Sequence, residues 1–180
     1  MNMNLNMNCN IVLTGFMGAG KTSLGKAVSK ILQVPFLDTD DLIVQSEGMP
    51  VSEIFRTKGE DYFRSLETET VRALGDRGDR YVLSVGGGLV MRPENRVLLH
   101  RCGLVVYLKA GIDTLAGRLA HDTKRPLLHQ GEGTLEEKIA RILALREPVY
   151  EEAADVVFLN DNKPFQQAAR EIASLADSKA

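Results

Sequence analysis

A glycine-rich segment near the start of the chain is the clearest sign of chemistry in this sequence. Residues 15–22 read GFMGAGKT, which matches the pattern GxxxxGK[ST] in full. The glycines allow the backbone to curl so that successive N–H groups point at phosphate oxygens. Lys21 would reach the outer phosphates, and the Thr22 hydroxyl would take a ligand position on Mg²⁺. The segment therefore predicts a site for a nucleotide.

Two carboxylates, Asp38 and Asp40, form a second candidate group. They follow apolar residues in PFLDTDD, residues 35–41, and their spacing places both side chains on one face if the chain stays extended. Acids beyond a strand end and beside a glycine loop suit a Mg²⁺ held through its waters and a substrate hydroxyl. The alternative is that Asp40 or Asp41 only caps a following helix. We expect Asp38 and Asp40 to serve the site and Asp41 to be the cap.

A serine and three glycines stand where an acidic residue is expected. The run YVLSV, residues 81–85, contains Ser84 and continues as Gly86, Gly87 and Gly88, without an Asp or Glu at its end. The hydroxyl would replace the missing acid through a water. The glycines would permit close approach of a ligand and offer N–H donors to a carboxylate or phosphate. A flexible connector remains the alternative.

Arg64 is a candidate for binding a carboxylate. Arginine grips a carboxylate in a bidentate fork, and Glu67, three residues later, would orient it. On a solvated helix the same pair would mean little. Phe55 and Phe63 are core residues by type that would also suit the wall of a small pocket.

Two further arginines are candidates for contact with an anion. Arg125 lies in the polar segment 121–133, which is too long for a plain connection and is therefore a lid candidate. From there it would close over a transferring phosphate. Arg146 precedes Pro148 at a predicted helix end, where it would at least complement the helix dipole.

The elements that position these residues alternate along the chain. Apolar runs of strand length occupy 11–14, 35–38, 81–85, 104–108 and 155–159. Segments with helical spacing occupy 21–32, 41–46, 51–57, 60–74, 93–100, 112–121, 134–146 and 164–176. This alternation predicts an α/β fold, a parallel sheet with helices on both faces.

Composition limits the class of protein. The 180 residues are 44% hydrophobic and 26% charged, which is typical of one globular domain and excludes a disordered or fibrous chain. We expect residues 1–9 to be a frayed extension and residues 10–180 to be a single domain. The net charge of -2 gives no basic field for a nucleic acid.

The environment of the protein is also indicated. Nothing approaches the roughly 18 consecutive apolar residues of a membrane span, so we expect no membrane partner. The two cysteines, Cys9 and Cys102, fit neither a disulfide framework nor a tetrahedral metal site. A reducing cytoplasm is the simplest interpretation.

Six motifs in order and spacing resemble shikimate kinase, over the chain from about residue 10 to the last helix. The motifs are GFMGAGKT, DTD at 38–40, IF at 54–55 with GE at 59–60 and FR at 63–64, SVGGG at 84–88, RPL at 125–127 and REPVY at 146–150. The resemblance implies a three-layer P-loop fold with a five-stranded parallel sheet in the order 2-3-1-4-5 and a mobile lid. It also implies ATP-dependent phosphorylation of the 3-hydroxyl of shikimate to give shikimate 3-phosphate and ADP, on the route to chorismate. Such a small kinase needs no partner chain, so a monomer is expected.

The resemblance also implies roles for individual residues. Catalysis would fall to Lys21, Asp40 and Arg125. The ATP site would comprise Gly18, Ala19, Gly20, Lys21, Thr22, Ser23, Arg118, Arg125 and Pro164. Shikimate would contact Asp40, Arg64, Gly86, Gly87, Gly88, Arg146, Phe55 and Phe63. Magnesium would be bound directly by Thr22, with Asp38 and Ser84 in contact with its water shell.

Three other functions are compatible with a phosphate-binding loop. A gluconate-type sugar-acid kinase shares the loop but leaves the DTD, GGG and FR motifs unexplained. A module that senses ATP without turning it over is disfavoured by the intact Lys21, Asp40 and Arg125. A nucleic-acid-stimulated ATPase is disfavoured by the charge balance and the 6% aromatic content.

Overall fold

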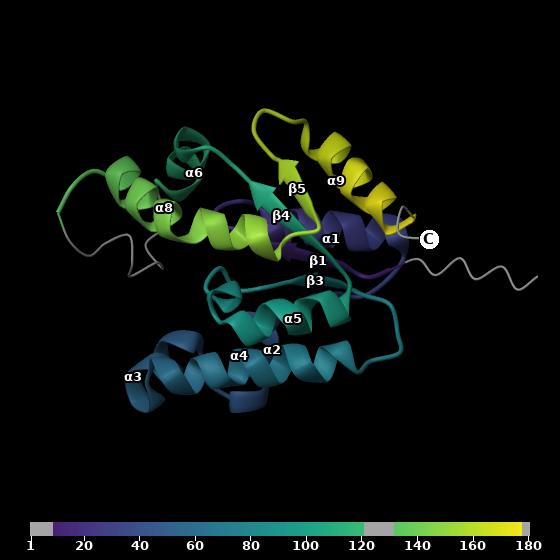
Figure 1. Ribbon diagram of the computed structural model, residues 1–180, viewed down its shortest axis with the longest axis horizontal. Coiled ribbons are helices and arrows are strands. Elements are labelled where there is room, and N and C mark those ends of the chain that lie inside the picture. The colour runs from purple at the N-terminus through teal and green to yellow at the C-terminus, as the bar shows by residue number, and fades with distance from the viewer. Residues whose placement is uncertain (1–8, 121–131, 178–180) are drawn as a thin grey trace, which may run out of the picture.

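Five parallel strands form the central sheet of the molecule, which a computed structural model describes for residues 9–120 and 132–177 (Figure 1). The strands are β1 (Ile11–Thr14), β2 (Phe36–Asp38), β3 (Val82–Ser84), β4 (Leu104–Lys109) and β5 (Val156–Leu159). They lie in the order β2-β3-β1-β4-β5, and β1 pairs with both β3 and β4. The predicted parallel sheet and its strand order are confirmed.

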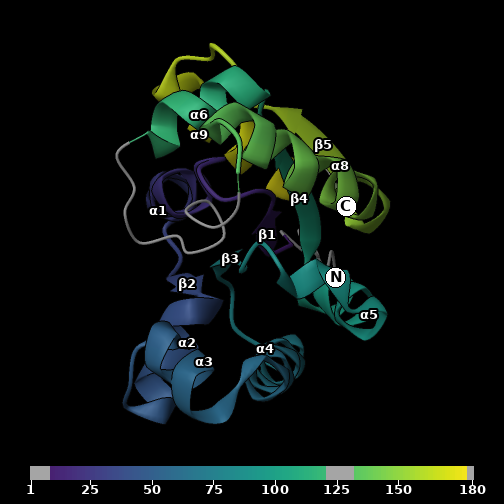
Figure 2. The same ribbon diagram turned by 90° about the vertical axis from the view of Figure 1, so that its left-hand side faces the viewer.

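Helices cover both faces of this sheet, as predicted. On one face α1 (Lys21–Leu32) packs beside α9 (Phe165–Ser174), and on the other lie α5 (Pro93–Cys102) and α8 (Leu135–Ala153) (Figures 1 and 2). Because the helices shield both faces of the central strands from water, these strands are apolar along most of their length, and residues 11–13 of β1 are fully buried.

Three further helices form a separate group beside β2. They are α2 (Thr39–Glu47), α3 (Val51–Lys58) and α4 (Glu60–Gly75), which lie together below the sheet in Figure 2. Ile43, Ile54 and Phe63 make a small core of their own there. The remaining elements are α6 (Ile112–Leu119), which packs on α8, and two short 3₁₀ helices, η1 (Leu89–Met91) and η2 (Leu175–Asp177).

The start of α2 corrects one prediction. The helix begins at Thr39, earlier than expected, because the carboxylate of Asp38 caps it by accepting the N–H of Asp40 at 3.0 Å. The capping role predicted for Asp41 is therefore wrong. The chain also does not stay extended through Asp40, which lies in the first helical turn.

The end of α8 corrects a second prediction. A capping box between Thr134 and Glu137 starts this helix where expected, but the helix does not end at 146 and continues through Pro148 to Ala153. An internal proline costs a helix about 3 kcal/mol. Because Tyr150 and Ala153 are buried against the rest of the protein, tertiary packing offsets this cost.

Three remaining predictions concern the N-terminal extension, the lid and the membrane. Cys9, which we expected to fray, donates its backbone N–H to the carbonyl of Ala176 at 3.2 Å, and residues 1–8 lie outside the described residues. Of the predicted lid, only Glu132 and Gly133 are described. Within residues 9–120 and 132–177, no helix has both the length and the apolar character needed to cross a membrane.

Candidate active site

A cavity of about 630 Å³ lies at the carboxyl ends of β1, β2 and β3. This is the place where parallel α/β sheets bind ligands, and the volume is in the usual range for small-molecule sites. Most of the residues predicted to form the site line it. They are Gly18, Gly20, Lys21, Thr22, Ser23, Asp38, Asp40, Phe63, Arg64, Ser84, Gly86, Gly87, Gly88, Arg118 and Arg146.

The phosphate-binding loop forms the floor between β1 and α1. Gly15, Gly18 and Gly20 have φ values of 141°, 78° and 99°, which side chains rarely tolerate. Gly20 has no side chain to cap α1, so the positive end of the helix remains available to an anion in the cavity. The ammonium of Lys21 donates to the carbonyls of Gly15 at 2.8 Å and Phe16 at 3.0 Å, and so lies against the loop.

Three oxygen-bearing side chains meet at one corner of the cavity. The Thr22 hydroxyl donates to Oδ2 of Asp38 at 3.3 Å. Asp38 and Ser84 are register partners at the ends of β2 and β3, and Ser84 is buried. The predicted metal-binding residues are therefore brought together by three different elements.

Two of the three glycines, Gly86 and Gly88, lie closely against charged side chains. A Cβ on Gly86 would lie 2.9 Å from Glu67 Oε1 and 3.1 Å from Asp40 Oδ1, and a Cβ on Gly88 would lie 2.7 Å from Arg64 Nη1. Gly86 also donates its N–H to the hydroxyl of Thr39, the residue after Asp38, at 3.0 Å. These contacts favour a close-packed segment over the flexible connector.

Arg64 is held by two carboxylates on its own helix, α4. Its Nη1 donates to Glu67 Oε2 at 2.8 Å, and its Nε and Nη2 donate to Glu60 Oε1 at 3.2 and 3.0 Å. The Glu67 side chain is only 1% exposed. Burial raises the pKa of Glu67 to about 7, although the Arg64 cation opposes this shift. The arginine is therefore oriented by a largely buried acid, as the spacing suggested.

Arg118 joins the phosphate loop to the segment after β5. Its guanidinium donates to the carbonyls of Gly18 at 3.1 Å, Ala19 at 3.2 Å and Asn160 at 3.4 Å. The buried amide of Asn160 also donates to the Ala19 carbonyl, at 2.7 Å. This corner of the cavity is thus built by three segments far apart in the sequence.

Four predicted site residues are not placed on the cavity wall. Ala19 is fully buried, with its N–H bonded to Phe16, so only its carbonyl serves the site. Phe55 packs on Phe63, with ring centroids 4.8 Å apart, and does not line the cavity. Pro164 caps α9 and is likewise absent from the lining, and Arg125 lies outside the described residues.

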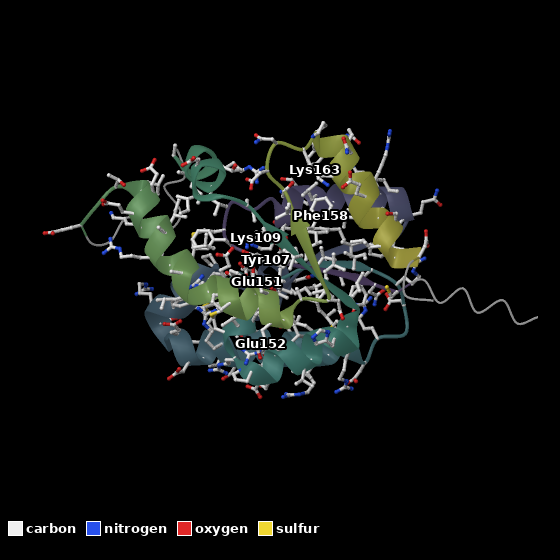
Figure 3. The ribbon with its side chains drawn as sticks, turned by 45° about the horizontal axis from the view of Figure 1, so that its top comes forward. Tyr107, Lys109, Glu151, Glu152, Phe158 and Lys163 are labelled. Carbon is white, nitrogen blue, oxygen red and sulfur yellow. The ribbon has the colours of Figure 1, made fainter. Side chains whose placement is uncertain are left out.

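Several lining residues were not predicted. They are Met17, Leu24, Val51, Val85 and Phe165, with Glu67 predicted only as an orienting group. Asn160 and Lys163 were not predicted individually, but they fall in the segment 159–164, which the resemblance places beside the adenine. Asn160 follows directly after β5, so the rule that strand ends build the site would have found it. The Nζ of Lys163 lies 4.5 Å from the centre of the Phe158 ring, and both residues are labelled in Figure 3. No motif in the sequence marks Lys163 as a site residue.

Comparison with known proteins shows the family of this chain. A family model described as shikimate kinase matches residues 17–176. The chain belongs to the shikimate kinase family. The enzyme therefore catalyses ATP-dependent phosphorylation of the 3-hydroxyl of shikimate, which gives shikimate 3-phosphate and ADP in the pathway to chorismate and the aromatic amino acids.

Relatives and solved structures agree with the family model. Shikimate kinases of Geobacter metallireducens and Dictyoglomus turgidum are 46% and 40% identical, over 80% and 92% of this chain and 79% and 96% of theirs. The structure of shikimate kinase from Acinetobacter baumannii in complex with shikimate is 36% identical, with a TM-score of 0.85 over 94% of this chain and 93% of that one. A gluconokinase from Sinorhizobium meliloti, 19% identical with a TM-score of 0.55 over 96% of this chain and 93% of its own, shares the fold alone. The sugar-acid kinase alternative is therefore not supported.

Proposed function

We propose that the cavity holds ATP and shikimate at opposite walls, so that the transferring phosphate lies between Lys21 and Asp40. The observation that carries this proposal is the composition of the two walls. The loop before α1 offers a cation and a helix N-terminus, and Arg64 and Arg146, from two other helices, add two further cations to the lining. A nucleotide triphosphate and a small carboxylic acid suit these walls.

Lys21 and the start of α1 would bind the outer phosphates of ATP. Lys21 now donates to two loop carbonyls, and a phosphate oxygen would offer it a charged acceptor in their place. Arg118 would flank the adenine together with residues 160–165, since its guanidinium already bridges the loop and Asn160. Arg125 would close over the transferring phosphate from the segment outside the described residues.

Mg²⁺ fits the corner formed by Thr22, Asp38 and Ser84. These groups supply hydroxyl and carboxylate oxygens, the ligands that Mg²⁺ prefers, and Thr22 Oγ1 and Asp38 Oδ2 already lie 3.3 Å apart. In the described residues no three or more His, Cys, Asp or Glu side chains gather into a metal cage. This suits a cation that keeps several waters and binds phosphate oxygens. When bound, Mg²⁺ would neutralise charge on the β- and γ-phosphates.

Shikimate would be held by its carboxylate and its hydroxyls. Arg64, Arg146 and the backbone of Gly87 would bind the carboxylate, with Gly86 and Gly88 shaping the same wall and Phe63 lining it. Asp40 would orient the hydroxyls and accept the proton of the attacking one. Because the transition state of phosphoryl transfer is loose, this positioning should matter more than the strength of the base.

The release of ADP tests the proposed roles. Purified enzyme with Mg·ATP should release ADP with shikimate and not with gluconate or quinate. Asp40→Ala should abolish this release, whereas Asp41→Ala, on the exposed side of the same helix turn, should leave it unchanged. Equal activity in the two variants would exclude Asp40 from the reaction, and ADP release that does not require shikimate would overturn the two-wall arrangement.

We also propose that residues 10–180 act as one domain, as a monomer, in the cytoplasm. The free thiols of Cys9 and Cys102 support a reducing compartment. The cation and anion sites described above all come from one chain, which supports a monomer. Light scattering during gel filtration should give the mass of one chain; a stable dimer mass would contradict the proposal.

A further inference from the structure

Tyr150 is a fully buried side chain that contacts the glycine segment from behind the cavity. It lies on α8, and its hydroxyl donates to the carbonyl of Gly87 at 2.6 Å. Its ring stacks on that of Tyr107 in β4, with centroids 5.1 Å apart and planes 28° apart. Burial raises the pKa of the Tyr150 hydroxyl, so it remains a proton donor throughout the physiological range.

Gly87 is closely packed against residues of two other segments. A Cβ on Gly87 would lie 3.3 Å from the carbonyl oxygen of Gly15 and 3.4 Å from the Tyr150 hydroxyl. A Cβ on Gly15 would in turn lie 3.4 Å from Cδ2 of Tyr107. The start of the phosphate loop, the glycine segment and α8 therefore meet at one close-packed point. Because packed interiors transmit small shifts, a displacement of the Gly87 carbonyl would move its neighbours.

Tyr150 also lies one helical turn after Arg146. Residues four apart share a helix face, so anchoring Tyr150 limits where the Arg146 guanidinium can reach. Between them is Pro148, which has no N–H to donate to the carbonyl of Ala144. This turn of α8 consequently depends more than usual on contacts outside the helix.

One other anchor of this turn is an ion-pair cluster at the end of β4. The Nζ of Lys109 lies 2.9 Å from Glu147 Oε1 and 2.8 Å from Glu151 Oε1. Lys109 and Glu151 are labelled near Tyr107 in Figure 3. These side chains are 31–47% exposed, and such exposed pairs contribute little to stability. The hydroxyl of Tyr150, buried and short-bonded, is therefore the stronger anchor.

We propose that Tyr150 is a positioning residue for shikimate: its hydroxyl fixes the Gly87 backbone relative to Arg146, so that the two groups converge on one carboxylate. The inference rests on the proposed function, which assigns both groups to that carboxylate. Tyr150 does not line the described cavity, so it acts through these two groups without touching the substrate.

Tyr150→Phe removes only the hydroxyl, and Tyr81→Phe is its matched control. Tyr81 is also buried, and its hydroxyl also donates to a backbone carbonyl, that of Leu74 at 2.8 Å, but it lies outside the cavity. We expect Tyr150→Phe to raise the KM for shikimate about fivefold, with kcat and the KM for ATP within about twofold of the parent enzyme. Tyr81→Phe should change none of the three by more than about twofold.

Measurements of thermal stability and a third variant, Arg146→Ala, separate a loss of positioning from a loss of folding and from a wrong assignment of the carboxylate site. Thermal unfolding should show similar losses for both phenylalanine variants, and kinetics are recorded at a temperature where all variants are folded. An unchanged KM for shikimate in Tyr150→Phe, or the same change in Tyr81→Phe, would overturn the inference. Arg146→Ala tests the underlying assignment: if it also leaves the KM unchanged, the proposed carboxylate site fails, whereas if it raises the KM, only the role of Tyr150 fails.

Discussion

The buried carboxyl of Glu67 should make the stability of the enzyme depend on pH near neutrality. Its pKa is raised from 4.5 to about 7, because burial outweighs the opposing charge of Arg64, and the nearby carboxylate of Asp40 adds to the increase. The folded protein therefore binds this proton more tightly than the unfolded chain does. The stabilising contribution is complete below about pH 4.5 and is lost as the pH rises through about 7.

The magnitude follows from the size of the shift. Each pKa unit corresponds to about 1.4 kcal/mol, so Glu67 should lower the free energy of unfolding by about 3 kcal/mol between pH 4.5 and pH 8. Glu67→Gln keeps the shape and a hydrogen-bond acceptor for Arg64 but cannot ionise. The free energy of unfolding of this variant, minus that of the parent, should therefore increase by about 3 kcal/mol over the same range.

Urea unfolding at several pH values between 4.5 and 8 measures this difference. The matched control is Glu60→Gln, which removes the other carboxylate bound to Arg64 but at a side chain that is 63% exposed. We expect its difference from the parent to stay constant with pH within about 1 kcal/mol. If the difference between Glu67→Gln and the parent also stays constant with pH, Glu67 is ionised throughout the range and the argument from burial is wrong.

Four further substitutions test the proposed binding and catalytic roles. Lys21→Ala should lower kcat at least about 10²-fold, as should Arg125→Ala, because each would remove a cation proposed to contact the transferring phosphate. A smaller loss in steady-state assays would contradict these roles. Arg64→Ala should chiefly raise the KM for shikimate, and unaltered shikimate affinity by calorimetry would exclude its role in binding. Gly88→Ala should raise the same KM because its Cβ would lie 2.7 Å from Arg64 Nη1, and a normal KM would show that Arg64 can move without cost.

The fold was predictable because its signals are local. Residues 11–14 and 104–108 are continuous apolar runs, as strands buried on both faces must be, and the glycine loop between β1 and α1 has a fixed spacing. The strand order came from the resemblance, because periodicity alone does not say which strands are neighbours. Local rules failed at Pro148, where burial of Tyr150 and Ala153 outweighs the helix-breaking tendency of proline.

Most of the candidate site was predictable because its residues lie in or beside a recognisable motif. Asp38 illustrates the limit: its position after a strand suggested a site residue, yet the same carboxylate also caps α2. Asn160 and Lys163 enter the cavity from beyond β5. Their types are common on surfaces, so residue type alone does not mark them as site residues. Phe55 is the opposite case: it was predicted to line the cavity, but it packs on Phe63 and does not line it.

The contacts of Arg64 explain what the buried carboxyl of Glu67 contributes in return for its cost in stability. An exposed arginine paired only with Glu60 would be mobile, because surface ion pairs restrict side chains weakly. The second partner, Glu67, is buried, and its carboxyl lies where only a glycine leaves room, at Gly86. Burying that acid costs stability near neutral pH, as the raised pKa of Glu67 expresses. In the proposed role of Arg64, this orientation precedes the arrival of the shikimate carboxylate and so would lower the entropy lost on binding.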